Sequence, residues 1–321
     1  MQAIMNYFRT FAGDMDDEVY MRRCLQLAAN GILGARPNPM VGAVIVARDR
    51  IIGEGYHVRC GEGHAEVNAF AAVRAEDEPL LHEATVYVSL EPCAHHGKTP
   101  PCADLIVAKG VRRVVVGCTD PFAKVQGRGI AKLRQAGIEV TVGVLERECR
   151  WLNRRFFTCH TQHRPYIIMK WAQTANGFID DHGHALQISN GQTLMLSHQL
   201  RAEEDAILVG HTTDAREHPL LTVRHWHGPN PKRIVLTRDR PLPQLIGDLC
   251  QQGVQSLIVE GGCQTHEAFI KAGLWDEIRV ETAPRCVAAG TRAPQLPDGL
   301  LLLSLRRHEG NLLARYAKGG A

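Results

Sequence analysis

The sequence predicts an α/β protein built from two domains. Apolar runs of strand length alternate with segments of helical period along most of the chain. A length of 321 residues favours two domains over one. The composition, with 45% hydrophobic and 22% charged residues, is that of a globular protein with a core of normal size.

The first half shows the alternation most clearly. A helical apolar stripe over residues 16–30 ends at Gly31 and Gly34. Strands are then expected at 41–47, 51–56, 85–90, 111–116 and 138–145, and helices at 64–74, 103–109 and 130–136. Helices between strands favour parallel pairing, so we expect a largely parallel sheet in this half.

A basic and aromatic stretch over residues 151–164 marks the boundary, and a second α/β pattern follows Pro165. Strands are expected at 166–170, 206–209, 233–237, 256–259 and 277–281, and helices at 193–203 and 264–272. We find no internal repeat and no low-complexity segment in the chain.

Charge and hydropathy exclude several classes of protein. The net charge of +3 is too small to indicate a nucleic-acid partner. No segment approaches the ~20 apolar residues of a membrane helix. Residues 1–14 lack the apolar region of a signal peptide, so we expect a flexible extension there and a cytoplasmic protein. The ten cysteines do not have the spacing of a disulfide framework and are expected to be reduced.

Three of the remaining residues are candidate metal ligands: His64, Cys93 and Cys102. Three protein ligands are typical of catalytic zinc, which keeps one position for water and lowers the pKa of that water. Glu66, two residues after His64, is expected to move protons rather than to bind the metal. The pattern therefore predicts hydrolytic removal of an amino group from a nitrogen heterocycle.

The expected secondary structure supports this interpretation. His64 and Glu66 open a helix, so both can face a cleft beyond its end. Cys93 follows a strand, where ligand sites of α/β sheets gather. Cys102 precedes a helix, whose N-terminus favours the thiolate. Each feature alone has a plain alternative, a surface His-x-Glu or a core cysteine, and the prediction depends on their joint occurrence.

This pattern resembles the cytidine-deaminase superfamily, although eight residues separate the two cysteines where that superfamily usually has Cys-x-x-Cys. Residues 91–102, Glu-Pro-Cys-Ala-His-His-Gly-Lys-Thr-Pro-Pro-Cys, resemble the deaminase half of the bifunctional deaminase–reductases of riboflavin biosynthesis. Segments 37–42, 53–57 and 120–129 are similar to that family too, and the resemblance covers residues 15–150.

The resemblance implies a three-layer cytidine-deaminase-like domain with one Zn²⁺ per chain. It also implies a small-molecule substrate, a diaminohydroxypyrimidine with a phosphoribosylamino group. Asn38, His57, His95 and Lys98 would bind this substrate. The amide of Asn38 suits a pyrimidine edge, and the Lys98 ammonium suits a phosphate.

The second half resembles the reductase domain of the same family, which has a dihydrofolate-reductase-like fold and uses NADPH. The matching segments are 165–166, 170, 201–202, 207–210, 219–224, 259–262 and 273–277. The residues that would face the substrate are Lys170, Arg201, Leu221, Arg224 and Glu260. Those that would face NADPH are Ala172, Thr213, Glu217, Gly261 and Gly262, the glycines approaching a phosphate at a helix start.

This half also departs from the family pattern. Asn176 and Glu217 stand where the family usually has Asp, and a Trp-Ile-Thr element is reduced to residues 187–189, Gln-Ile-Ser. Between Thr237 and Leu257 about one strand–helix unit is missing, so we expect a truncated domain with a free sheet edge.

The expected organisation is a flexible extension (1–14), a deaminase domain (15–150), a linker (151–164) and a reductase-like domain (165–321). The expected function is deamination followed by NADPH-dependent reduction of the ribosyl side chain to ribityl. Two alternatives stay open: a deaminase with a non-catalytic reductase-like scaffold, and a nucleic-acid-editing deaminase, which would need a basic groove. No nucleic acid or membrane partner is expected, and a homodimer is left open.

Overall fold

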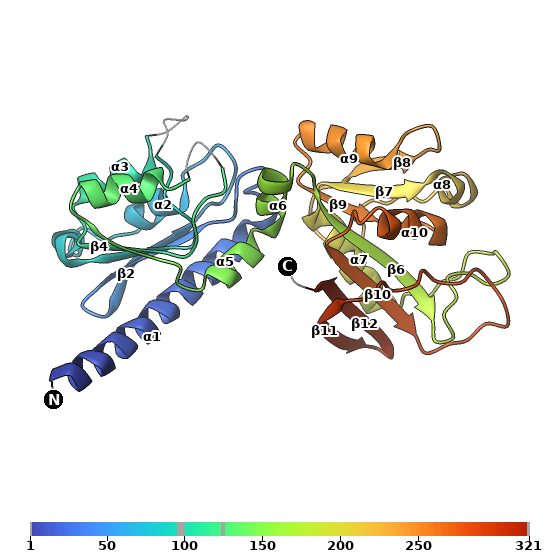
Figure 1. Ribbon diagram of the computed structural model, residues 1–321, viewed down its shortest axis with the longest axis horizontal. Coiled ribbons are helices and arrows are strands. Elements are labelled where there is room, and N and C mark those ends of the chain that lie inside the picture. The colour runs from blue at the N-terminus through green and yellow to red at the C-terminus, as the bar shows by residue number, and fades with distance from the viewer. Residues whose placement is uncertain (1, 95–99, 123–125, 320–321) are drawn as a thin grey trace. The chain divides into compact units, whose positions relative to one another are not determined.

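The computed structural model describes residues 2–94, 100–122 and 126–319, with the backbone alone for residues 2–15. The chain divides into two compact units, Met1–Thr161 and Gln162–Ala321, each built around its own β-sheet (Figure 1). Both units are α/β, as the sequence predicts.

Within the described residues, unit 1 has a five-stranded sheet in the order β2-β1-β3-β4-β5. Its strands are β1 Gly42–Ala47, β2 Arg50–Tyr56, β3 Thr85–Val88, β4 Arg113–Val116 and β5 Glu139–Val142. Its α-helices are α1 Gln2–Ala29, α2 Ala65–Ala71, α3 Cys102–Lys109, α4 Arg128–Gln135, α5 Glu146–Leu152 and α6 Arg154–Gln162, with 3₁₀ turns η1 Asn30–Leu33 and η2 Glu78–Glu83.

Side chains alternate across this sheet and produce three layers. Ile45 and Val86 pack with α2, α3 and α4 on one face, whereas Val44 and Tyr87 pack with α1, α5 and α6 on the other. Because both faces are covered, every residue of β1 is buried. The three-layer architecture that the resemblance implied is confirmed.

The prediction of a largely parallel sheet is wrong for half of the pairings in unit 1. β3 pairs in parallel with β4, and β4 with β5, but β1 is antiparallel to both of its neighbours, β2 and β3. A tight turn at Arg48 and Asp49, which both have positive φ, makes β1 and β2 an antiparallel hairpin. β2 and β3 are joined through α2 and run in the same direction, so β1, which lies between them, is antiparallel to both.

Two terminal segments of unit 1 differ from what was expected. The backbone of residues 2–14 continues helix α1, where a flexible extension was predicted. Helices α5 and α6 include most of residues 151–164, where a linker was predicted. Phe156 and Phe157 of α6 join the core beneath α1, so burial of these aromatic side chains stabilises helix in that segment.

Unit 2 has a seven-stranded sheet in its described residues, in the order β11-β12-β10-β6-β9-β7-β8. The strands are β6 Tyr166–Thr174, β7 Ala206–Gly210, β8 Lys232–Leu236, β9 Ser256–Val259, β10 Glu277–Ala283, β11 Leu300–His308 and β12 Asn311–Lys318. The helices are α7 Gly191–Glu203, α8 His211–Glu217, α9 Leu242–Gln251 and α10 Cys263–Lys271.

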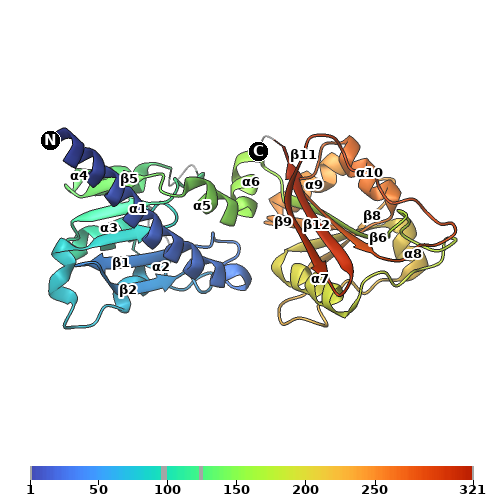
Figure 2. The ribbon, with the colours of Figure 1, turned by 90° about the horizontal axis from the view of Figure 1, so that it is seen from below.

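Strands β8, β7, β9, β6 and β10 run parallel, and the hairpin β11–β12 adds antiparallel strands beside β10. Helices α9 and α10 cover one face and α7 the other, as Figure 2 shows. Helices α8 and α9 and the hairpin were not among the predicted elements. Three leucines of β11 are exposed, so this strand lacks the one-sided apolar pattern that predicts a strand.

The sheet of unit 2 ends at β8 in the part of the chain that the structure describes. Helix α9 begins six residues after β8 and leads directly into β9. Between β8 and β9 the described chain therefore forms one helix and no further strand, and the truncation expected from the sequence stays a prediction.

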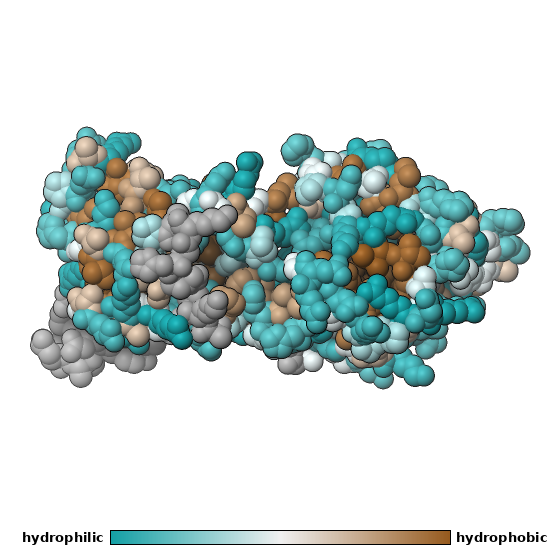
Figure 3. Space-filling view, turned by 90° about the horizontal axis from the view of Figure 1, so that it is seen from above, coloured by the Kyte–Doolittle hydropathy of each residue, from teal (hydrophilic) through white to brown (hydrophobic). Residues whose placement is uncertain are grey.

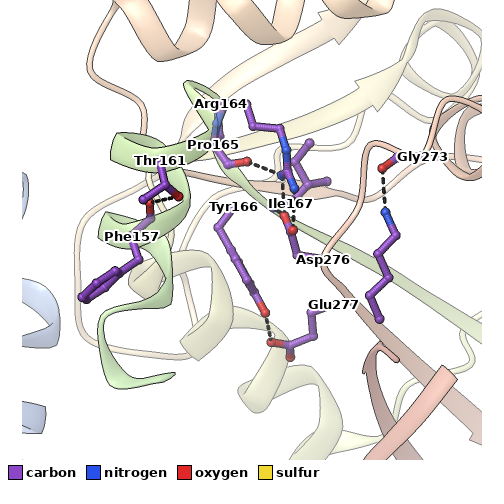
Figure 4. Close-up of polar contacts among 10 residues, drawn as sticks. Phe157, Thr161, Arg164, Pro165, Tyr166, Ile167, Gly273, Asp276 and Glu277 are labelled. Carbon is purple, nitrogen blue, oxygen red and sulfur yellow. Dashed lines mark hydrogen bonds and ion pairs between the residues drawn. The ribbon is translucent and has the colours of Figure 1, made fainter. Parts of the chain in front are cut away.

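Unit 2 begins with a polar joint between the starts of β6 and β10 (Figure 4). Arg164 forms two hydrogen bonds of 2.6 Å with Asp276, and the backbone N–H of Ile167 donates to the same carboxylate at 2.8 Å. The Tyr166 hydroxyl donates to buried Glu277 at 3.3 Å. Two of the segments that carry the resemblance, 165–166 and 273–277, are thus adjacent in space and hold the sheet together.

On the face shown in Figure 3, hydrophilic residues cover most of the surface and apolar residues form separate patches. None of the helices in the described residues is both long enough and apolar enough to cross a membrane.

Candidate active sites

Three ligand side chains from separate segments of unit 1 lie together. His64 immediately precedes α2, Cys93 follows β3, and Cys102 is the first residue of α3. Their ligand atoms all lie within 4.8 Å of one another. His64 Nδ1 is 3.6 Å from Cys93 Sγ and 3.3 Å from Cys102 Sγ.

Both the spacing and the donor atoms fit zinc. Tetrahedral zinc, with Zn–S of about 2.3 Å and Zn–N of about 2.0–2.1 Å, holds neighbouring ligand atoms roughly 3.5–3.8 Å apart. The two N–S distances agree with this to within a few tenths of an ångström. One imidazole and two thiolates leave a fourth position, which is the arrangement of catalytic zinc.

The protein prepares the thiolate that a metal requires. The backbone N–H of Cys102 donates to Cys93 Sγ at 3.3 Å. Hydrogen bonds from the Cys102 thiol and from His64 lower the pKa of Cys93, and the first of them raises the pKa of Cys102 in return. Cys93 is therefore the readier of the two to lose its proton to the metal.

Glu66 lies in the first turn of α2 and is buried beside both cysteines. Burial, followed by the charge on Cys93, raises the pKa of its carboxyl group. A carboxyl group with a raised pKa can hold and release a proton near neutral pH, as a general acid–base requires.

Asn38 and His57 form a hydrogen-bonded pair near the metal ligands. His57 is buried, and its Nδ1 lies 3.1 Å from the Gly63 carbonyl, which can only accept. The proton therefore sits on Nδ1, and Nε2 accepts from the Asn38 amide at 3.1 Å. Burial lowers the pKa of His57 and keeps the ring neutral. This arrangement turns the Asn38 oxygen away from His57, and it makes His57 a support for Asn38.

Glu91, in the motif 91–102, has a structural role that was not predicted from the sequence. Its buried carboxylate accepts backbone N–H groups of Asp120, Gly127, Gly129 and Ile130 at 2.9–3.4 Å. A Cβ atom on Gly129 would lie 1.9 Å from the Pro92 carbonyl oxygen, so only glycine fits there. The sequence held a sign of this contact, because Glu91 and most of its partners lie in two motifs, 91–102 and 120–129, that both carry the resemblance.

Two of the predicted substrate residues, His95 and Lys98, lie outside the described residues. Their assignment stays a prediction.

Unit 2 holds a half-buried cluster of charged side chains on one face of its sheet. Arg201 Nη2 donates to Glu260 Oε2 at 2.7 Å, and Lys170 Nζ is 4.0 Å from Glu260 Oε1. Burial opposes ionisation of Glu260, but Lys170 and Arg201 outweigh it and lower the pKa of this carboxyl group. The three residues come from β6, α7 and the end of β9, and all three were predicted to face the substrate.

This cluster has hydrogen-bonding capacity left over. Among the described residues, neither Glu260 Oε1 nor Arg201 Nε has a hydrogen-bond partner, although both atoms are buried. Buried polar atoms are normally paired, so a ligand or water is the expected partner. The cluster is therefore suited to bind a polar molecule.

The segment with Leu221 and Arg224 lies against the same helix α7. Arg201 Nη1 donates to the Thr222 carbonyl at 3.3 Å, and the backbone N–H of Arg224 donates to His198 Nδ1 at 2.9 Å. Leu221 is buried in the core with Leu200, while the Arg224 side chain is exposed. His198 was not singled out from the sequence.

The residues predicted to face NADPH are only partly brought together. A Cβ atom built on Gly262 would lie 3.4 Å from Thr213 Oγ1, so α8 and the start of α10 are adjacent. Ala172 lies on β6, paired in register with Glu281 of β10. Glu217 is exposed at the end of α8, and no described contact joins it to the glycines.

One of the departures from the family pattern, Asn176, has a structural account. Asn176 donates its amide to the Val287 carbonyl at 2.8 Å, a bond that an aspartate would not make. Ser189 donates its hydroxyl to the buried Glu281 at 2.7 Å. Both side chains fasten loops of unit 2.

Known proteins resemble the chain in both units. The family model described as the cytidine and deoxycytidylate deaminase zinc-binding region matches residues 14–118. The RibD C-terminal domain matches in two pieces, 165–246 and 241–310, which meet in the interval of the expected truncation.

Whole-chain relatives extend this result. The riboflavin biosynthesis protein RibD of Aquifex aeolicus is 38% identical over 85% of this chain and 88% of its own, and that of Actinobacillus pleuropneumoniae is 43% identical over 92% and 89%. The solved diaminohydroxyphosphoribosylaminopyrimidine deaminase/5-amino-6-(5-phosphoribosylamino)uracil reductase of Thermotoga maritima is 31% identical, with a TM-score of 0.87 over 95% of this chain and 99% of its own. With a zinc deaminase domain and an NADPH-dependent reductase domain on one polypeptide, this chain belongs to the RibD family of bifunctional deaminase–reductases of riboflavin biosynthesis.

Proposed function

We propose that the chain carries out the two reactions named for the Thermotoga maritima protein, with the side chains described above in defined roles. Unit 1 would replace the amino group of diaminohydroxyphosphoribosylaminopyrimidine by oxygen. Unit 2 would then reduce the ribosyl group of 5-amino-6-(5-phosphoribosylamino)uracil to ribityl. The grouping of His64, Cys93 and Cys102 beside buried Glu66 is the observation that carries this proposal.

In the deaminase site, bound zinc supplies the Lewis acidity that makes water a nucleophile at neutral pH. Glu66 takes a proton from the attacking water and delivers it to the ring nitrogen. A second proton transfer, to the amino group, lets that group leave as ammonia. Asn38, held by His57, presents its amide oxygen to the pyrimidine edge. His95 and Lys98 are proposed to contact the rest of the substrate, with Lys98 at the phosphate.

In the reductase site, Lys170, Arg201 and Glu260 are proposed to bind the substrate with their unused donors and acceptor, and Leu221 and Arg224 to border it. NADPH is proposed to lie over Gly261 and Gly262, where backbone N–H groups at the start of α10 meet a phosphate. Ala172, Thr213 and Glu217 complete the proposed cofactor site.

The test is a reaction of the purified, zinc-loaded chain with the diaminopyrimidine substrate, followed by mass spectrometry. Without NADPH we expect the product in which an amino group has been replaced by oxygen. With NADPH we expect a further gain of two hydrogen atoms. A product that stops at the first stage in the presence of millimolar NADPH would support the alternative of a deaminase with a reductase-like scaffold.

The proposed domains are 15–150 and 165–321, and the proposed location is the cytoplasm, where the ten cysteines would stay reduced. A homodimer is also proposed. Light scattering over a range of protein concentrations would test it, and a mass equal to one chain throughout would exclude it.

A further inference from the structure

We propose that His198 is a positioning residue of the reductase site, which ties the segment that carries Leu221 and Arg224 to the helix that carries Arg201. The inference rests on the proposed reductase function. His198 lies on α7, three residues before Arg201, and is fully buried. Its ring contacts backbone of the segment and is assigned no direct contact with the reacting atoms.

The segment has no regular structure of its own and depends on side chains for its hydrogen bonds. The Thr222 carbonyl accepts from Arg201 Nη1 at 3.3 Å, and the Val223 N–H donates to Asn230 Oδ1 at 2.8 Å. The Arg224 N–H donates to His198 Nδ1 at 2.9 Å. Two neighbouring side chains of α7 therefore hold the segment at two points, and one of these side chains also binds Glu260.

Leu221 shows why such a tie is needed. Its φ of 53° lies in the left-handed region, which costs a leucine free energy and persists only when the surroundings impose it. Leu221 is also buried against Leu200 of α7. A segment that must keep this conformation beside the substrate needs fixed anchors close to Leu221, and His198 supplies the one at Arg224.

The contact requires a neutral ring, because a protonated Nδ1 would be a donor facing another donor. Burial, followed by the charges of Arg201, His225 and Arg224, lowers the pKa of His198 to about 4, while Glu260 acts in the opposite direction. The ring of His225 meets that of His198 edge to face at 4.8 Å between centroids. At neutral pH His198 therefore keeps Nδ1 as an acceptor and its proton on Nε2.

Matched substitutions separate this role from simple packing. His198→Asn keeps an acceptor close to the position of Nδ1, His198→Leu fills the space without one, and His198→Gln moves the polar group toward the position of Nε2. The full chain, loaded with zinc, would be assayed for KM and kcat with 5-amino-6-(5-phosphoribosylamino)uracil at saturating NADPH. NADPH affinity and the deaminase rate serve as internal controls.

We expect His198→Leu and His198→Gln to raise KM by about tenfold or more, since a hydrogen bond is lost and a buried N–H is left without a partner. In both, kcat, NADPH affinity and the deaminase rate should change by less than about threefold, which is no more than the loss of one weak hydrogen bond would cause. His198→Asn should restore KM to nearly the wild-type value. An Asn variant as impaired as the Leu variant, or a Leu variant with normal KM, would overturn the proposal.

Hydrogen exchange of the Arg224 amide gives a readout that does not depend on turnover. It should be protected in the wild type and in His198→Asn, and exchange faster in His198→Leu. If the wild type lacks reductase activity, the proposed function of unit 2 fails. The exchange result would then still decide whether His198 holds the segment, because equal protection in all variants contradicts the tie.

Discussion

At the zinc site, residues with similar surroundings have different tasks. His64 and Glu66 are two positions apart, yet the imidazole faces the two thiols and the buried carboxyl group is left to move protons. Asn38 owes its orientation to His57, whose proton is fixed on Nδ1 by the Gly63 carbonyl. Substitutions at single residues should therefore separate metal binding from proton transfer.

Cys102→Ser should remove most of the zinc from the purified protein. A serine hydroxyl is a far weaker zinc ligand than a thiolate, and two protein ligands hold the metal poorly. Metal analysis of the protein should show about one zinc per chain in the wild type. The control is Cys286→Ser, which changes an exposed thiol in unit 2 and should leave the zinc content unchanged. Full zinc retention by Cys102→Ser would remove Cys102 from the ligand set.

Glu66→Gln should keep its zinc and lose deamination. The amide is similar in shape but cannot exchange protons, and general acid–base catalysis contributes about 10²–10⁴-fold to a rate. Ammonia release at saturating substrate, measured beside the zinc content, gives both results from one sample. Glu62→Gln, on the exposed loop before His64, is the matched control. Turnover by Glu66→Gln near the wild-type rate would mean that another group moves the protons.

At the scale of elements, the starts of helices carry the chemistry of both units. α2 and α3 begin at zinc ligands, and α10 begins at the two glycines proposed to hold NADPH. Helix α10 also contains His266, which is fully buried against Trp171 with 5.1 Å between ring centroids.

The stability of unit 2 should consequently fall in mild acid. Burial lowers the pKa of His266 to about 4, below the ordinary value of 6.5 that it regains on unfolding. Between these two values the unfolded chain binds more protons, so the free energy of unfolding decreases as the pH falls from 6.5 toward 4. One such group accounts for at most about 3 kcal/mol.

His266→Leu should make the urea midpoint less dependent on pH over this range. Fluorescence of Trp171, which contacts the ring, would follow the transition. The comparison with the wild type at each pH cancels the contribution of the other titrating groups. An equal loss of stability in both proteins between pH 6.5 and 4 would show that His266 does not protonate on unfolding.

At the scale of the whole molecule, the two activities depend on different units, each with its own sheet and core. The resemblance implies that unit 2 lacks about one strand–helix unit, and its sheet ends at β8 within the described residues. The resemblance implies that this region helps to bind the adenosine part of NADPH. The deaminase should therefore be intact while the reductase binds NADPH weakly.

NADPH binding measured by calorimetry should be weak but detectable. Each lost charge-assisted contact costs about 1.5–3 kcal/mol, or roughly ten- to a hundredfold in affinity, so two losses move a micromolar site toward millimolar. Gly262→Leu should abolish the remaining binding, because the larger side chain would extend into the proposed phosphate position. The backbone itself should tolerate the change, since a Cβ atom at Gly262 has no protein atom closer than 3.4 Å.

Gly247→Leu is the control for this variant, since that glycine of α9 has open space around it. The deaminase rate should be unchanged in both. Tight NADPH binding by the wild type would show that the expected truncation does not weaken the cofactor site, and undiminished binding by Gly262→Leu would move the cofactor away from α10.

The secondary structure and the zinc ligands could be predicted from the sequence because both depend on local patterns of residues. The order of helices and strands follows from apolar periodicity, and the zinc ligands follow from the joint occurrence of three short motifs. The roles of His198 and Glu91 did not follow. Their partners are backbone N–H groups 26 to 39 residues away, and a backbone group leaves no mark in a sequence.

The sequence by itself determined the α/β class, the zinc chemistry and the family, because these depend on periodicity and on the identity of a few side chains. Only the tertiary structure decided that β1 runs antiparallel to β3, that residues 151–164 are largely helical, and which polar atoms remain unpaired around Glu260. Those features depend on which segments bury one another. That burial sets the local dielectric, the pKa of each buried group and the available hydrogen-bond partners.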